Sequence, residues 1–326
     1  MRDVEEAYRL IGGEMKTMED LAAAALAHVD PFVEEVVRYS FRIGGKRLRP
    51  ALLFLSAKAA GCLNKKHVRT AAAIEMVHTA SLIHDDILDG ASIRRHLATV
   101  NVQWSAQVGV LAGDLLLTKA MELMTDENEI HGFRRLTDAC RRTCEGELHQ
   151  IGTIGRFDMT VDEYFLMIAG KTAPLLACSA ELGAYYAEAD KGTVEVFRMF
   201  GLRLGLAFQM IDDILDLVGE TDTTGKTLRT DLVNRKPTLP LILYLRNVNE
   251  RERNETLKTI RNEKFDEAAA LTIVRKLCDS GVVREAQEVA RKEIDEAVES
   301  ILCLDADAEA IAGLVAIAKF VGNRKK

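Results

Sequence analysis

Apolar residues recur at three- and four-residue spacing along most of this chain, which is the pattern of a helix with one buried face. The periodic stretches are separated by short breaks that contain glycine or asparagine, and only five prolines occur in 326 residues. This pattern predicts an all-α protein. We expect helical segments over residues 17–60, with short breaks, and over 65–89, 107–125, 129–150, 160–183, 188–218 and 238–320. No linker or low-complexity stretch divides them, so we expect a single domain over residues 1–326.

Residues 219–237 are the main exception to the helical pattern. The segment is polar and contains few apolar residues that could anchor it to a core. It therefore predicts a loop between two helices. Because long loops inside compact domains are more often functional than idle, we expect this loop to take part in the protein's activity.

The composition is that of an ordinary protein with a large core. Apolar residues make up 48% of the chain, charged residues 29%, and the formal net charge is −7. A mildly acidic chain is not expected to bind nucleic acid in general. The N-terminus lacks the basic and apolar regions of a signal peptide, and Lys58 and Asp114 interrupt the most apolar stretches, so we expect no membrane span. These features predict a cytoplasmic protein.

The six cysteines include no C-x-x-C pair, and most of them have apolar neighbours. They are therefore expected to be reduced thiols. Cys140 and Cys144 share a helix face by their spacing, so a disulfide or a zinc site at this pair is the less favoured alternative.

The pattern DDILD occurs twice, at Asp85–Asp89 and at Asp212–Asp216. Chance would give roughly 0.1 DDxxD matches in a chain of this aspartate content, so the repetition carries information. In each copy the first and last aspartates lie on one helix face, where like charges repel unless a cation neutralises them. The candidate metal ligands are Asp85, Asp86, Asp89, Asp212, Asp213 and Asp216.

Carboxylates without interleaved histidine or cysteine favour Mg²⁺, which keeps water ligands and bridges to phosphate oxygens. We therefore predict two walls of magnesium-binding carboxylates facing one polyphosphate. The alternative interpretation is a pair of acidic helix ends exposed to solvent.

Residues suited to binding phosphate occur in several further segments. Residues 44–50 read GGKRLRP, in which two glycines allow the backbone to approach a ligand and three cations follow. Arginine binds phosphate through two parallel hydrogen bonds, whereas lysine acts as a point charge. The candidates are numerous enough for two diphosphates. They are Gly45, Lys46, Arg49, Arg94, Arg95, Lys226, Lys236 and the C-terminal Arg324, Lys325 and Lys326.

Lys171 and Thr172 lie just before Pro174 in a helical segment. The missing N–H of Pro174 leaves the carbonyl of Gly170 without its helical partner, which predicts a kink that turns Lys171 inward. The alternative is a surface lysine beside an ordinary kink.

Two more polar residues share a helix face with an aspartate cluster. His78 lies on the face of Asp85, and Gln209, preceded by Phe208, comes one turn before the second cluster. A buried structural role is the alternative for His78 and for Phe208.

These segments resemble the all-trans isoprenyl diphosphate synthases of the polyprenyl synthetase family. The resemblance covers nearly the whole chain, and its motifs occur in the family's order: GGKRLRP (44–50), IHDDILDGASIRR (83–95), AGKT (169–172), FQMIDDILD (208–216), GK (225–226) and RKPTLP (235–240). It implies a helical bundle around a deep central cavity, usually in a homodimer. Contact with a membrane is expected only transiently, during product release.

The resemblance also implies roles for the candidate residues. The aspartates would bind three Mg²⁺ ions that hold an allylic diphosphate, assisted by Arg94, Lys171, Lys226 and Lys236. Isopentenyl diphosphate would be held by Gly45, Lys46, Arg49, His78 and Arg95, with residues 324–326 closing over it. Thr172, Gln209 and the carbonyl of Gly170 are uncharged dipoles suited to facing a carbocation. The base that removes the final proton is expected to be the departed diphosphate.

Product length is expected to depend on the helix that carries the first aspartate cluster. Ile74, Val77, Ala80 and Ser81 would line the tunnel that receives the growing chain, with Phe133 or Leu136 of a neighbouring helix as its floor. Because Ala80 and Ser81 are small, and each residue adds about 1.5 Å of depth, the resemblance implies a product of about 30–40 carbon atoms. A geranylgeranyl or farnesyl diphosphate synthase is the alternative.

Three other functions are weighed against this hypothesis. A class I terpene cyclase shares the helical fold but binds one diphosphate, so GGKRLRP and the second cluster argue against it. A phosphohydrolase that uses His84 and Asp85 would leave the second cluster unexplained. A catalytically inactive partner subunit of a heteromeric synthase is the non-enzyme alternative, and it is expected to have degraded aspartate clusters.

Overall fold

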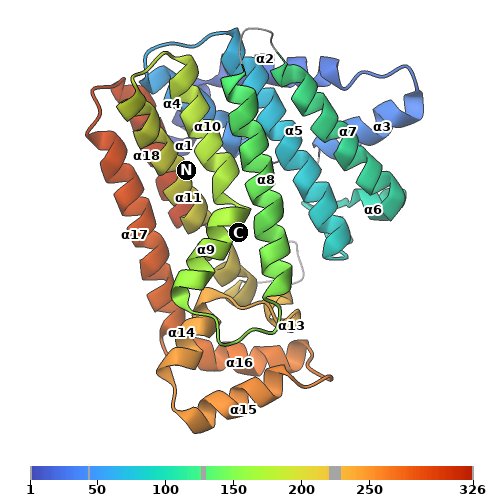
Figure 1. The fold of residues 1–326 in the computed structure, drawn as a ribbon, viewed down its shortest axis with the longest axis vertical. Coiled ribbons are helices and arrows are strands. Elements are labelled where there is room, and N and C mark those ends of the chain that lie inside the picture. The colour runs from blue at the N-terminus through green and yellow to red at the C-terminus, as the bar shows by residue number, and fades with distance from the viewer. Residues whose placement is uncertain (1, 43–44, 126–129, 220–228, 325–326) are drawn as a thin grey trace. The chain divides into compact units, whose positions relative to one another are not determined.

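The computed structural model describes residues 2–42, 45–125, 130–219 and 229–324, and these residues confirm the all-α prediction (Figure 1). The exception is a small antiparallel hairpin of β1 (Ile93–Arg94) and β2 (Leu97–Ala98). The helices are α1 (Arg2–Leu10), α2 (Gly12–Ala25), α3 (Pro31–Arg42), α4 (Leu48–Ala59), α5 (Lys65–Leu88), α6 (Val100–Gln103), α7 (Ala106–Met124), α8 (His131–Gly152), α9 (Val161–Lys171), α10 (Ala173–Tyr186), α11 (Lys191–Val218), α13 (Thr230–Val233), α14 (Leu239–Asn247), α15 (Glu250–Ile260), α16 (Glu267–Asp279), α17 (Val282–Leu302) and α18 (Ala308–Gly322).

The chain forms two compact units. Unit 1 consists of Met1–Cys140, Leu175–Gly201 and Val298–Ile317. Unit 2 consists of Arg141–Pro174, Leu202–Ala297 and Ala318–Lys326. One aspartate cluster belongs to each unit, Asp85–Asp89 to unit 1 and Asp212–Asp216 to unit 2.

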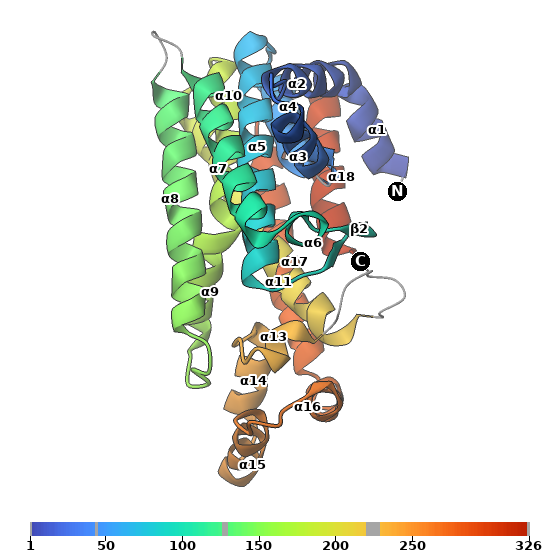
Figure 2. The ribbon, with the colours of Figure 1, turned by 90° about the vertical axis from the view of Figure 1, so that its right-hand side faces the viewer.

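Helix α5 is the central element of unit 1. Asn64 caps its N-terminus together with His67 in a reciprocal capping box, and residues 71–77 are buried on every side. A helix that is apolar all round must lie inside the protein. Accordingly α5 packs against α2, α4 and α7, and it lies alongside α7 in both views of the ribbon (Figures 1 and 2). The first aspartate cluster therefore lies at the C-terminal end of a helix whose middle turns are buried in unit 1.

In unit 2, glycines allow helices to approach one another closely around Lys171 and Thr172. A Cβ on Gly146 of α8 would overlap the backbone of Gly170, and a Cβ on Gly205 of α11 would overlap Ala173. Side chains larger than hydrogen would separate these backbones. The two contacts hold the end of α9 beside α8 and α11.

The kink expected near Pro174 is present. The predicted helix 160–183 is divided into α9 and α10, which are bent by 55° relative to one another at Thr172. The 17–60 region, expected to contain short breaks, corresponds to α2, α3 and α4, although α2 begins earlier, at Gly12. The 238–320 region is divided into α14 to α18.

Among the described residues, no single helix is both long enough and apolar enough to cross a membrane. The bent pair α9 and α10 meets those requirements by length and composition only.

Candidate functional site

The aspartates of unit 1 occupy the last turn of α5 and its cap. The helix ends at Leu88, and Asp89 is the C-terminal cap residue. Asp85 is partly exposed and Asp89 is exposed. Helix C-termini already carry partial negative charge, so carboxylates placed there lower stability unless a cation binds them. The second cluster lies inside the last two turns of α11, which ends at Val218, and the oxygen donors of both clusters fit a hard divalent cation.

Asp86 is distinguished from its neighbours by an ion pair within the protein. It is 4% exposed, and both of its oxygens accept hydrogen bonds from Nε of Arg94, at 2.8 and 3.0 Å. A second guanidinium nitrogen of Arg94 lies 2.8 Å from the same carboxylate. This fork ties the β1–β2 hairpin to α5 and gives Asp86 a protein cation as partner. Its role as a metal ligand stays a prediction.

Predicted isopentenyl diphosphate residues converge around His78 in unit 1. Burial lowers the pKa of His78 well below its usual range, and the positive charges of Arg49 and Arg95 lower it further, followed by Arg94. Loss of solvent around Arg49 lowers its pKa to about 10; the charge of Glu75 opposes this shift, and that of Arg95 adds to it. The imidazole is therefore neutral at pH 7 among several cations. Such a concentration of positive charge is favourable when an anion occupies it.

The conformation of the GGKRLRP segment explains its glycine at position 45. A Cβ there would overlap the guanidinium of Arg95, whose own backbone has φ of 52° at the tip of the β1–β2 hairpin. The next residue, Lys46, accepts a hydrogen bond on its carbonyl from the hydroxyl of Tyr8. Gly44 lies outside the described residues.

Glu75 is a residue of this cluster that the sequence did not reveal. It is 1% exposed on α5 and lies 2.7 Å from a guanidinium nitrogen of Arg47, which begins α4 with φ of 52°. Its position in an otherwise apolar stretch of the sequence could have indicated an ion pair, since a buried carboxylate requires a partner.

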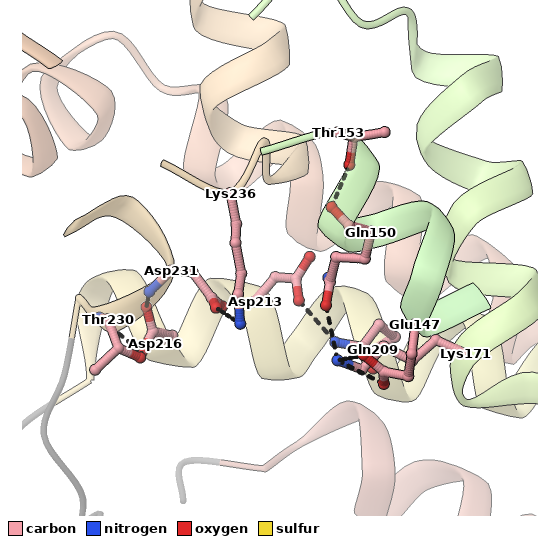
Figure 3. A network of polar contacts seen from close by, with 10 residues as sticks. All are labelled: Glu147, Gln150, Thr153, Lys171, Gln209, Asp213, Asp216, Thr230, Asp231 and Lys236. Carbon is pink, nitrogen blue, oxygen red and sulfur yellow. Dashed lines mark hydrogen bonds and ion pairs between the residues drawn. The ribbon is translucent and has the colours of Figure 1, made fainter. Parts of the chain in front are cut away.

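The aspartates of unit 2 differ in exposure and partners, and Figure 3 shows Asp213 with Gln209 and Asp216 with Thr230. The Asp212 side chain is 44% exposed and lies 3.3 Å from Arg324. Asp213 is buried and accepts hydrogen bonds from the hydroxyl of Tyr164 and from Nε2 of Gln209. Asp216 accepts hydrogen bonds from the hydroxyl and backbone N–H of Thr230, at 2.9 and 3.3 Å, and thus holds the start of α13.

Excess negative charge is evident in this second cluster. Burial, followed by the neighbouring charge of Asp231, raises the pKa of Asp213 to about 7. Burial raises the pKa of Asp216 to about 6, again with Asp231 as the next cause. Burial and a neighbouring negative charge both disfavour the ionised form of these carboxyl groups. A bound cation offsets both effects, so this cluster is suited to binding one.

Asp231 was missed in the sequence because it belongs to neither DDILD copy. Its carboxylate lies 3.3 Å from Nζ of Lys236, so the structure brings a predicted lysine to this cluster (Figure 3). Both residues come from the segment 219–237 that we expected to be functional. Lys226, from the same segment, lies outside the described residues, as do Lys325 and Lys326.

Lys171 at the end of α9 is held by two residues of α8 (Figure 3). Its Nζ lies 2.9 Å from Oε1 of Glu147 and 2.9 Å from Oε1 of Gln150. The adjacent hydroxyl of Thr172 donates a hydrogen bond to Oε1 of Gln209. The structure therefore brings Lys171, Thr172 and Gln209 together in unit 2, as predicted. Glu147 and Gln150 could not be found by spacing, because α8 is distant in sequence.

The residues expected to set product length lie on two helices of unit 1. Ile74, Val77 and Ala80 are buried along α5, and Ser81 is partly exposed with its hydroxyl donating to the carbonyl of His78. Phe133 is at the start of α8 and is partly exposed. Their effect on product length stays a prediction.

Comparison with known proteins adds independent information. The family model described as polyprenyl synthetase matches residues 30–277. Solanesyl diphosphate synthase 1, chloroplastic, of Arabidopsis thaliana is 33% identical over 304 residues, covering 91% of this chain and 73% of the relative. Geranylgeranyl diphosphate synthase of Saccharolobus solfataricus is 35% identical over 279 residues, covering 82% of this chain and 83% of the relative.

Solved structures give the same result. A polyprenyl synthase from Caulobacter crescentus CB15, complexed with calcium and isoprenyl diphosphate, has a TM-score of 0.93 at 32% identity, covering 99% of this chain and 98% of the other. A decaprenyl diphosphate synthase from Rhodobacter capsulatus has a TM-score of 0.91 at 28% identity, with 99% of each chain covered.

Proposed function

The chain belongs to the polyprenyl synthetase family and is a prenyltransferase, and we propose that it condenses isopentenyl diphosphate head-to-tail with an allylic diphosphate to give an all-trans polyprenyl diphosphate. The observation that carries this proposal is that two predicted phosphate-binding segments meet in unit 1, where the guanidinium of Arg95 on the β1–β2 hairpin lies against Gly45 of the GGKRLRP segment. It supports a binding site for a second anion in addition to the one served by the aspartates. A terpene cyclase binds one diphosphate and does not require a second anion site.

Both aspartate clusters are proposed to hold Mg²⁺, with three ions expected when substrate is bound. Asp85, Asp89, Asp212 and Asp216 are the more suitable ligands, since they are at least partly exposed, whereas Asp86 and Asp213 are buried. Bound Mg²⁺ neutralises the negative charge that the leaving diphosphate develops. The Caulobacter crescentus structure, which contains calcium and isoprenyl diphosphate, supports a divalent cation in this role.

The residues of the chain then act on the two substrates. Lys171 and Lys236, with Lys226, bind the allylic diphosphate as its C1–O bond breaks. The double bond of isopentenyl diphosphate attacks C1, a new C–C bond forms, and a proton is lost to the departed diphosphate. Thr172 and Gln209 face the cation with neutral dipoles, which stabilise positive charge without supplying a nucleophile. Exclusion of water protects the cation from being quenched.

We propose a long-chain product. Relatives named for long products, including an octaprenyl diphosphate synthase of Haemophilus influenzae at 30% identity, support this choice. The geranylgeranyl diphosphate synthase relative supports the shorter alternative. The small side chains of Ala80 and Ser81 on α5 favour the longer one.

The assembly and location are also proposals. We propose a cytoplasmic homodimer that contacts membranes transiently when product is released. Light scattering of the purified protein tests the dimer, and cell fractionation tests the location. A monomer, or a stably membrane-bound enzyme, would contradict them.

The decisive experiment is an elongation assay. Purified protein is incubated with Mg²⁺, labelled isopentenyl diphosphate and a series of allylic diphosphates, and the dephosphorylated products are sized. The proposal expects consumption of isopentenyl diphosphate and chain growth. Cyclic products made without isopentenyl diphosphate, or phosphate release without chain growth, would support the cyclase or the phosphohydrolase instead. An inactive protein would support the partner-subunit alternative.

A further inference from the structure

Four side chains of unit 2 form a continuous series of hydrogen bonds. The hydroxyl of Tyr164 on α9 donates to Oδ2 of Asp213, at 2.7 Å. Nε2 of Gln209 donates to Oδ1 of the same carboxylate, at 2.8 Å. Oε1 of Gln209 in turn accepts the hydroxyl of Thr172. Tyr164 is fully buried, and Asp213 and Gln209 are 5% and 8% exposed. Thr172, at the other end of the series, is partly exposed.

The series has a fixed direction because of its donors and acceptors. The NH₂ group of Gln209 faces Asp213, because Nε2 is the atom that donates to Oδ1 of that carboxyl group. The amide oxygen is then turned to Thr172. A threonine hydroxyl has one proton, and here that proton is given to Gln209. Thr172 can therefore offer only its lone pairs to any other group.

We propose that Tyr164 is a positioning residue for prenyl transfer: by holding Asp213, it sets the amide orientation of Gln209 and, through Gln209, the hydroxyl orientation of Thr172. The inference rests on the proposed function, because Gln209 and Thr172 matter if an allylic cation forms beside them. Asp213 serves in this arrangement as an orienting carboxylate, with one oxygen bonded to each neighbour.

The orientation has a direct effect on the barrier. Lone pairs directed at a developing cation lower its free energy, whereas a rotated amide or hydroxyl would present positive N–H or O–H ends to it. Preorganised dipoles are effective because they need no rearrangement during the reaction. Without the Tyr164 hydroxyl, Gln209 is the one remaining side-chain donor to Asp213. The Gln209 amide and the Thr172 hydroxyl then sample unproductive orientations. The expected consequence is a lower kcat with unchanged substrate binding.

Tyr164→Phe tests the proposal, with Tyr244→Phe as a matched control. Tyr244 is also buried in unit 2, and its hydroxyl donates to Glu252 at the same distance, 2.7 Å. Both variants lose one hydrogen bond between a buried tyrosine and a carboxylate. We expect Tyr164→Phe to lower kcat about tenfold, with both KM values and the half-saturating Mg²⁺ concentration within about twofold of wild type. Tyr244→Phe is expected to keep the wild-type kcat. Equal kcat values for the two variants would overturn the proposal.

A double-mutant cycle separates positioning from a general structural role. In a Gln209→Leu background the amide is absent, so Tyr164→Phe is expected to cause no further loss of kcat. Losses that multiply would show that Tyr164 acts independently of Gln209, and would overturn the inference. If Tyr164→Phe does not fold, Asp213→Asn takes its place, because its amide can face Gln209 with either end. It too is expected to lower kcat while leaving the half-saturating Mg²⁺ concentration unchanged.

Different results would overturn the proposed function and the positioning role of Tyr164. If wild-type protein does not elongate allylic diphosphates, the proposed function is wrong. If wild type elongates them and Tyr164→Phe has the kcat of Tyr244→Phe, the function holds and the positioning role is wrong. A large increase in the Mg²⁺ requirement of Asp213→Asn would instead assign that carboxylate to a metal ion and overturn the orienting role.

Discussion

At the scale of single residues, Gly45 gives a direct test of the arginine cluster. In Gly45→Ala the new methyl group must displace the guanidinium of Arg95, which is the flexible end of a long side chain. We therefore expect the KM for isopentenyl diphosphate to rise about tenfold, corresponding to about 1.4 kcal/mol, with the KM for the allylic substrate unchanged. Steady-state kinetics measure both. Gly13→Ala in α2, where a Cβ has nothing within 4 Å, is the control. Equal changes in the two KM values would contradict the assignment of Arg95.

Asp213 gives a pH dependence whose sign can be worked out. In the metal-free folded protein its pKa is about 7, because of burial and Asp231, against an ordinary value of 3.8. Between these two pH values the folded state holds a proton that the unfolded chain has lost, so stability falls as the pH rises through this window. Asp213→Asn lacks this dependence. Its stability relative to wild type is expected to increase by up to about 1.4 kcal/mol per pH unit toward pH 7.

Denaturant unfolding in EDTA between pH 5 and pH 8 measures that difference. Above pH 7 the difference is expected to level off, because Asp213 is then ionised in both states. If the difference in unfolding free energy between Asp213→Asn and wild type does not change with pH, the pKa of Asp213 is not raised in the folded protein.

At the scale of helices, the two clusters place negative charge at C-terminal ends that disfavour it. Removing one such charge is therefore expected to stabilise the metal-free protein while destroying its activity. For Asp85→Asn at the end of α5 we expect a gain of about 0.3–1 kcal/mol in EDTA. We also expect a loss of nearly all elongation activity. Unfolding curves and the elongation assay measure the two effects. A less stable metal-free variant would mean that the aspartate has a structural role in α5.

The face of α5 also provides a test of product length. Ala80 is fully buried, so Ala80→Phe risks overpacking the core, whereas the partly exposed Ser81 leaves more room. Both substitutions are expected to shorten the products, and Ser81→Phe to do so with less loss of stability. Leu82→Phe, one residue further and about 100° around the helix, is the control. Unchanged chain lengths in both test variants, sized by chromatography, would contradict the tunnel prediction.

Helices were the most predictable part of this fold. The expected 65–89 and 188–218 correspond closely to α5 (Lys65–Leu88) and α11 (Lys191–Val218), because a long periodic pattern leaves little choice. The divisions between α14 and α18 were missed, since one-turn breaks barely disturb the periodicity. The same limit applies to the site. Each copy of DDILD could be recognised within one segment, but Glu147 and Tyr164 reach their partners only through tertiary packing.

At the scale of the whole molecule, each unit contributes one acidic helix end, and both are proposed to bind Mg²⁺. Mg²⁺ together with inorganic diphosphate is therefore expected to raise the stability of the full chain by about 2.7 kcal/mol at a hundredfold excess over Kd. Asp85→Asn in unit 1 and Asp212→Asn in unit 2 are each expected to remove most of this gain. Asp305→Asn, an exposed carboxylate outside both clusters, is expected to keep it. Thermal unfolding with and without the ligands measures the effect, and full stabilisation of either cluster variant would show that the other cluster binds the ligand by itself.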